Sequence, residues 1–123
     1  MSVTIVLTPP AALLNANDRM HHHPKAKLTR AWREAACAAV ESGFHPFRFE
    51  RAHVTCIIRF ADNIRRDVGN FYPTAKACLD GIVDAGVLED DSDLHILGPD
   101  MRREWPNGEP RVTLTVEPIG EAQ

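Results

Sequence analysis

Residues 53–60, with the sequence HVTCIIRF, alternate apolar and polar side chains in the pattern of a strand with one buried face. The apolar side carries Val54, Cys56, Ile58 and Phe60. Residues 3–8 (VTIVLT) and 111–116 (RVTLTV) alternate in the same way and predict two more strands, and LHIL at 94–97 predicts a short fourth one. A sheet with one face packed on a core is therefore expected.

Two helices are predicted between these strands. Thr29 can cap the start of the first helix, and Gly43 can end it. Residues 11–28, before this helix, are expected to form a polar loop. The second is predicted from Asn70 to Ala85, with Gly86 as its stop. Their apolar stripes hold Trp32, Ala35, Ala36, Ala39 and Val40 in the first, and Tyr72, Ala75, Leu79, Ile82 and Val83 in the second. The order β-α-β-α-β-β predicts an α/β (α+β) fold, with two helices packed on a mixed sheet.

Composition is consistent with one such domain over residues 1–123. Hydrophobic residues make up 44% of the chain and charged residues 25%, as in ordinary globular proteins. No apolar run approaches the roughly 18 residues that a membrane span requires, so no membrane association is expected. The three cysteines, Cys37, Cys56 and Cys78, lie in separate apolar stretches. We expect them to be buried free thiols in a reducing cytoplasm.

Charge is distributed unevenly along the chain. Residues 1–66 hold ten Lys/Arg and five Asp/Glu, a net charge of +5, whereas residues 67–123 hold four Lys/Arg and twelve Asp/Glu, a net charge of −8. This asymmetry suits a basic surface that approaches nucleic acid beside an acidic pocket that binds a cation. Two ordinary solvated faces would give the same charge counts, and we leave that alternative open.

Two acidic corners flank the second predicted helix. Asp67 precedes it, and the EDDSD segment at 89–93 follows it. If the chain turns back after Gly86 and residues 87–94 lie beside strand 53–60, Asp91 would approach Asp67. Clustered carboxylates favour a hard cation such as Mg²⁺, and Lys76 between them could hold a phosphate oxygen. The alternative is a solvated turn, with Lys76 in a surface pair with Asp80.

The stretch RRDVGNFYPTAKACLDGIVDAGVLEDDSDLH, residues 65–95, resembles the RusA-type Holliday-junction resolvases. The matching positions are Arg66, Asp67, Asn70, Lys76, Leu79, Asp80, Ala85, Gly86, Asp90 and Asp91. The segment LTPPAALLNANDRM near the N-terminus is similar to the first strand and following Pro-Pro loop of that family. The likeness covers most of the chain and is most specific over residues 66–91.

The resemblance implies a structure-selective, Mg²⁺-dependent endonuclease, with Mn²⁺ as a substitute metal, that acts on Holliday junctions and other branched DNA. It implies a homodimer in the cytoplasm of a bacterium or a phage-infected cell. The catalytic residues would be Asp67, Asp91 and Lys76, and the metal ligands Asp67, Asp90 and Asp91. We expect DNA contacts from Arg65, Arg66, Asn70, Lys25, Lys27 and Arg30.

One departure from the family concerns the loop before the second helix. The second loop aspartate of the family is Gly69 here, so the loop offers one carboxylate. Asp93, Asn70 or water would complete the metal site, or the chain is a relative that binds junctions without cutting them. A small interaction domain unrelated to nucleic acid is a third alternative. The histidines at 21–23 are expected to line a phosphate-facing loop rather than to bind a metal.

Overall fold

A computed structural model describes residues 2–19, 22–43, 48–92 and 94–120. The described elements are β1 (Val3–Leu7), α1 (His22–Gly43), β2 (Ala52–Arg59), the 3₁₀ helix η1 (Val68–Phe71), α2 (Tyr72–Asp84), β3 (Ile96–Arg103) and β4 (Arg111–Pro118). The predicted class, a mixed sheet with two packed helices, is confirmed. No helix in these ranges is long and apolar enough to cross a membrane.

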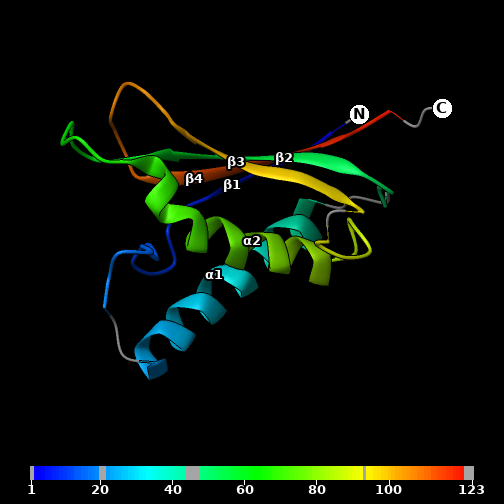
Figure 1. The fold of residues 1–123 in the computed structure, drawn as a ribbon, viewed down its shortest axis with the longest axis horizontal. Coiled ribbons are helices and arrows are strands. Elements are labelled where there is room, and N and C mark those ends of the chain that lie inside the picture. Colours follow the sequence, from blue (N-terminus) through cyan, green and yellow to red (C-terminus); the bar gives the residue numbers. More distant parts are fainter. Residues whose placement is uncertain (1, 20–21, 44–47, 93, 121–123) are drawn as a thin grey trace.

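The sheet has the strand order β1-β4-β2-β3, and both helices lie on one of its faces (Figure 1). β4 pairs antiparallel with β1 and with β2, whereas β2 and β3 run parallel. A parallel pair needs a crossover, and α2 supplies it. Every second side chain of β1, β2 and the first six residues of β4 is buried beneath the helices, as the alternation predicts.

The core includes one tryptophan and two of the three cysteines. Trp32 is fully buried in α1, and its indole nitrogen donates to the Ala12 carbonyl oxygen at 2.9 Å. Cys56 and Cys78 are buried and Cys37 is partly buried, and all three are free thiols. Burial raises the pKa of the Cys56 thiol to about 12, so this group packs as a small apolar side chain.

α1 begins earlier than predicted. The helix starts at His22, so residues 22–28 are helical rather than part of a polar loop. Thr29 is not a cap, because its hydroxyl donates to the Lys25 carbonyl oxygen one turn earlier inside the helix. Pro24 lies in the first turn, where a missing backbone N–H costs nothing. His21, which belongs to the same histidine run, lies outside the described residues.

α2 is shorter than predicted at its start, because residues 68–71 form η1 instead. Its end matches the prediction. Gly86 adopts φ +88°, and its N–H donates to the Val83 carbonyl oxygen at 2.9 Å. The Val87 N–H donates to the Ile82 carbonyl oxygen at 3.3 Å, which completes a glycine-based helix stop.

The return after Gly86 differs from the expectation that residues 87–94 lie along β2. Leu88 forms an isolated parallel bridge with Phe49 just before β2, and the Phe49 N–H donates to the Val87 carbonyl oxygen at 2.7 Å. The strand beside β2 is β3, which is longer than the predicted 94–97. β3, rather than residues 87–94, therefore pairs with β2, and the end of β3 reaches the loop that follows β2.

The two helices cross closely at Gly81. A Cβ atom at this position would lie 2.1 Å from the Arg33 carbonyl oxygen and 3.0 Å from the Ala36 Cβ. Gly81 and Ala36 are both buried, so the helix backbones meet there without intervening side chains. This crossing fixes how the basic half of α1 lies relative to α2.

We predict that Gly81→Ala separates the helices and lowers the free energy of unfolding by about 1–3 kcal/mol, the usual cost of overpacking, despite the better helix propensity of alanine. Thermal melting followed by circular dichroism measures the change. Gly120→Ala is the control, because nothing lies within 4 Å of a Cβ there. Equal melting temperatures for the two variants would contradict the close crossing.

Candidate functional site

Lys76 and Asp91 meet although they are fifteen residues apart. The Lys76 ammonium on α2 donates to Asp91 Oδ2 at 2.5 Å and to Asp80 Oδ1 at 2.7 Å. Asp80 lies one turn further along α2, and Asp91 belongs to the return segment after that helix. The structure thus contains both the pair matched by family resemblance and the helical i,i+4 pair of the alternative interpretation.

The three groups are partly exposed and carry coupled charges. Their side chains are 41% exposed for Lys76, 26% for Asp80 and 29% for Asp91, so water and a ligand can reach them. Burial lowers the pKa of Lys76, but its bonds to the two carboxylates outweigh that effect and the pKa is raised. The hydrogen bond from Lys76 lowers the pKa of Asp91. Lysine and Asp91 are therefore both charged at neutral pH.

The Asp67 side chain caps η1. Its Oδ1 accepts a hydrogen bond from the Gly69 N–H at 3.0 Å. Residues 68–71 form this 3₁₀ helix, so residues 67–69 are not one extended segment. A Cβ atom at Gly69 would nevertheless lie 3.3 Å from Asp67 Oδ1. The side chain of an aspartate at position 69 would therefore start next to the Asp67 carboxylate.

The predicted metal ligands Asp67, Asp90 and Asp91 are not gathered into one cluster. Within residues 2–19, 22–43, 48–92 and 94–120, no three His, Cys, Asp or Glu side chains are grouped closely enough to hold a metal ion. Asp90 is exposed, and its Oδ1 accepts from the Asp91 N–H at 2.6 Å. Asp93 lies outside the described residues.

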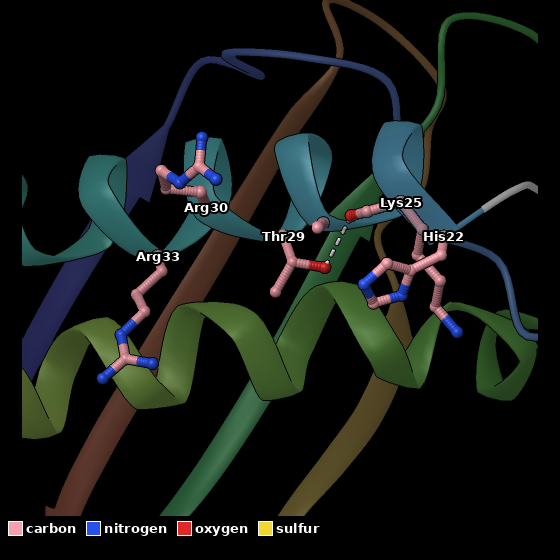
Figure 2. A pocket seen from close by; sticks show the side chains of 6 residues that line it. His22, Lys25, Thr29, Arg30 and Arg33 are labelled. Carbon is pink, nitrogen blue, oxygen red and sulfur yellow. Dashed lines mark hydrogen bonds between the residues drawn. The ribbon is translucent and has the colours of Figure 1, made fainter.

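A basic groove of about 500 Å³ runs along the first half of α1, and Figure 2 shows its side chains. We call it the α1 groove; its lining residues are His22, Lys25, Ala26, Thr29, Arg30 and Arg33. Lys25 and Arg30 were predicted to contact DNA and lie in it, whereas Lys27 is exposed on α1 without lining it. His22 places one of the predicted phosphate-facing histidines in the groove.

Arg33 lies between the α1 groove and the charged cluster formed by Lys76, Asp80 and Asp91. Its guanidinium donates to both oxygens of Asp84, at 2.6 and 2.8 Å. The hydrogen bond to Asp84 is the main reason that the pKa of Arg33 is raised, and the nearby Asp80 carboxylate raises it further. Asp80 therefore acts electrostatically on both Lys76 and Arg33.

The remaining predicted DNA contacts lie around η1. Arg65 is exposed, whereas the Arg66 guanidinium donates to Asp62 Oδ1 at 2.7 Å and lies 4.3 Å from the centroid of the Phe60 ring. Asn70 accepts from the Ala16 N–H through its backbone oxygen at 2.7 Å. Arg66 and Asn70 thus shape the loop as well as face the surface.

Sequence reasoning assigned no site role to Asp80, Arg33 or Thr29. The i,i+4 spacing of Lys76 and Asp80 was visible, but it indicated a surface pair. Arg33 could not be placed, because its partner Asp84 is on another helix. Compared with models of known protein families and with curated proteins, the chain matches none.

We predict that Asp91→Asn weakens the acid dependence of folding stability. Because the pKa of Asp91 is lowered in the folded chain, its stabilisation is present above the ordinary carboxyl pKa of about 3.9 and is lost as the pH falls through the lower folded value. The variant should unfold about 0.5–1 kcal/mol more easily at pH 7, a modest effect because the pair is partly exposed. Urea denaturation at pH 7 and at pH 3 measures the difference.

The difference between wild type and Asp91→Asn should shrink at pH 3. The control is Glu89→Gln, which removes an exposed neighbouring carboxylate. A stability difference that stays constant from pH 7 to pH 3 would argue against an ionised Asp91 bound to Lys76.

Proposed function

We propose that this chain is a RusA-type endonuclease that cuts phosphodiester bonds at Holliday junctions and other branched DNA with Mg²⁺. The observation that supports this proposal best is the contact of Lys76 with Asp91. The resemblance had assigned both residues to one catalytic site from positions far apart in sequence. A lysine beside carboxylates, next to a basic groove, suits a phosphate-bearing substrate.

The metal would be held by a smaller set than the one first predicted. Mg²⁺ commonly uses one or two carboxylates and takes its other ligands from water and phosphate oxygens. Asp80 and Asp91 already share one cation, the Lys76 ammonium, so the oxygens of these two carboxylates suit a cation between them. When bound, Mg²⁺ or Mn²⁺ would polarise a phosphate and activate water. Lys76 would hold a phosphate oxygen, and Asp67 would keep η1 in shape.

The DNA backbone would follow the basic residues of the first half of the chain. Lys25, Arg30 and His22 line the α1 groove, and Arg65 is exposed before η1. Phosphate contacts of this kind fix the position of DNA without reading its sequence. A homodimer would place two such sites on one four-way junction, as paired nicks require. Such an enzyme would work in the cytoplasm of a bacterium or a phage-infected cell.

A second candidate is a junction-binding relative without nuclease activity. Lys76 neutralises Asp91, Asp67 caps η1, and Gly69 replaces the second loop aspartate of the family. These features favour binding over cutting, and they leave the α1 groove unchanged.

We predict that the wild-type chain nicks a labelled four-way junction symmetrically in Mg²⁺ and not in chelator. Asp91→Asn should slow nicking at least 100-fold, because it removes a metal ligand and the partner of Lys76 together. Its junction affinity should stay near the wild-type value, because Asp91 repels phosphate rather than binding it. A linear duplex of the same sequence is the substrate control.

Binding without nicks would support the junction-binding relative, and neither binding nor nicks would leave an interaction domain unrelated to nucleic acid. If Asp91→Asn nicks the junction at the wild-type rate, Asp91 is not a metal ligand.

We predict that junction affinity falls steeply with salt and that the α1 groove accounts for part of the slope. Each phosphate contact contributes about 0.9 to the slope of log K against log salt. Lys25→Gln and Arg30→Gln should each reduce the slope by about 1. Arg48→Gln is the matched control, because Arg48 is exposed near the start of β2 and does not line the groove. If the slope of log K against log salt is unchanged in both groove variants, the DNA backbone does not follow the α1 groove.

A further inference from the structure

Four side chains stack beside the loop that follows β2. The Arg66 guanidinium lies 4.3 Å and the Arg103 guanidinium 4.8 Å from the centroid of the Phe60 ring. Arg103 also lies 4.0 Å from the centroid of the Trp105 ring. Arg103 is thus in contact with two aromatic rings, one buried and one exposed. Cations over aromatic faces in this distance range attract the ring.

The stack is fixed to the backbone of two loops. The Arg103 guanidinium donates to the Ile64 carbonyl oxygen at 2.8 Å and to the Asp62 carbonyl oxygen at 3.0 Å. From the β3–β4 loop, the Gly108 N–H donates to the Phe60 carbonyl oxygen at 2.9 Å, and the Asn107 amide donates to Ala61 at 3.2 Å. The two loops lie at the same end of the sheet (Figure 1). This mutual bonding restricts the position of the Trp105 ring.

Trp105 is 57% exposed, in contrast to Trp32, which is fully buried. An exposed tryptophan leaves a large apolar surface in water, although its position here is restricted by Arg103. Exposed aromatic rings next to arginines are the features on which proteins stack unpaired bases, because every base has a flat π face. Arg65 and Arg102, both exposed, lie in the two segments that form this end of the sheet and add positive charge there.

We propose that Trp105 is a stacking platform for a base whose face is left open in branched DNA. This inference rests on the proposed function for its substrate and adds the means of selecting it. In a continuous duplex both faces of each internal base are covered by neighbours. At a branch point or a strand end a base face is open, so only such DNA can stack on Trp105. Recognition of open bases would thus favour branched DNA over plain duplex.

The test compares wild type, Trp105→Ala and Trp105→Phe in binding a four-way junction, a single-stranded oligothymidine and a relaxed, covalently closed duplex circle, which has neither strand ends nor loops. Trp105→Ala should weaken binding to the oligothymidine and the junction by about 5- to 150-fold, the range for loss of one base stack, and leave duplex binding within about twofold. Trp105→Phe should recover most of the affinity. Leu97→Ala is the control, because Leu97 is equally exposed at 57% near the opposite end of β3.

Tryptophan fluorescence supplies a second readout. Oligothymidine should quench the emission of wild type, and the quenching should be lost in Trp105→Ala, which retains only the buried Trp32. Unchanged oligothymidine affinity in Trp105→Ala, or equal losses for all three DNAs, would overturn the proposal. Binding of a protein partner that needs Trp105, with no DNA effect, would also overturn it. Absence of nicking with the expected binding differences would refute the nuclease and leave the platform standing.

Discussion

The parallel pairing of β2 with β3 organises the whole molecule. A parallel partner cannot follow β2 through a tight turn, so α2 must carry the chain back before β3 starts. Gly86 then reverses the chain, and the following segment brings Asp91 to Lys76. β3 itself returns to the end of β2, where Arg103 bonds the loop at 62–64. One pairing thus produces both the charged cluster and the aromatic stack.

The two charge classes of the chain meet along α2. α1 crosses α2 at Gly81, and the basic first half of α1 forms the α1 groove. The last residue that lines this groove is Arg33, and the Asp80 carboxylate helps to raise the pKa of Arg33. Asp80 in turn shares Lys76 with Asp91. A DNA backbone drawn to the α1 groove would therefore arrive beside carboxylates that are already balanced by a cation. Phosphate could approach such a cluster without facing uncompensated negative charge.

Local patterns predicted the elements whose side chains alternate or keep helical spacing, including β2, β4 and the glycine stop of α2. They did not predict β3 in full, because Gly98 and Pro99 interrupt its alternating pattern. Gly98 has φ +101°, and a Cβ atom at this position would lie 2.5 Å from the Val54 carbonyl oxygen. The early start of α1 was missed because His22 to Lys25 show no apolar period. The resemblance placed Lys76 and Asp91 in one site but did not predict their direct contact. The only sequence signal at Asp80 was the i,i+4 spacing of a surface pair, and Arg33 depends on a partner from another helix.

We propose that Lys76 and Asp91 act as one unit in cutting DNA. A double-mutant cycle with Lys76→Met, Asp91→Asn and the double variant tests it, using the rate of the first junction nick in Mg²⁺ under single-turnover conditions. Residues that act as a unit lose their effect together, so the double variant should be no slower than the slower single variant. Rate losses that multiply in the double variant would show that the two residues act independently, and Lys76 and Asp91 would then not form one catalytic unit.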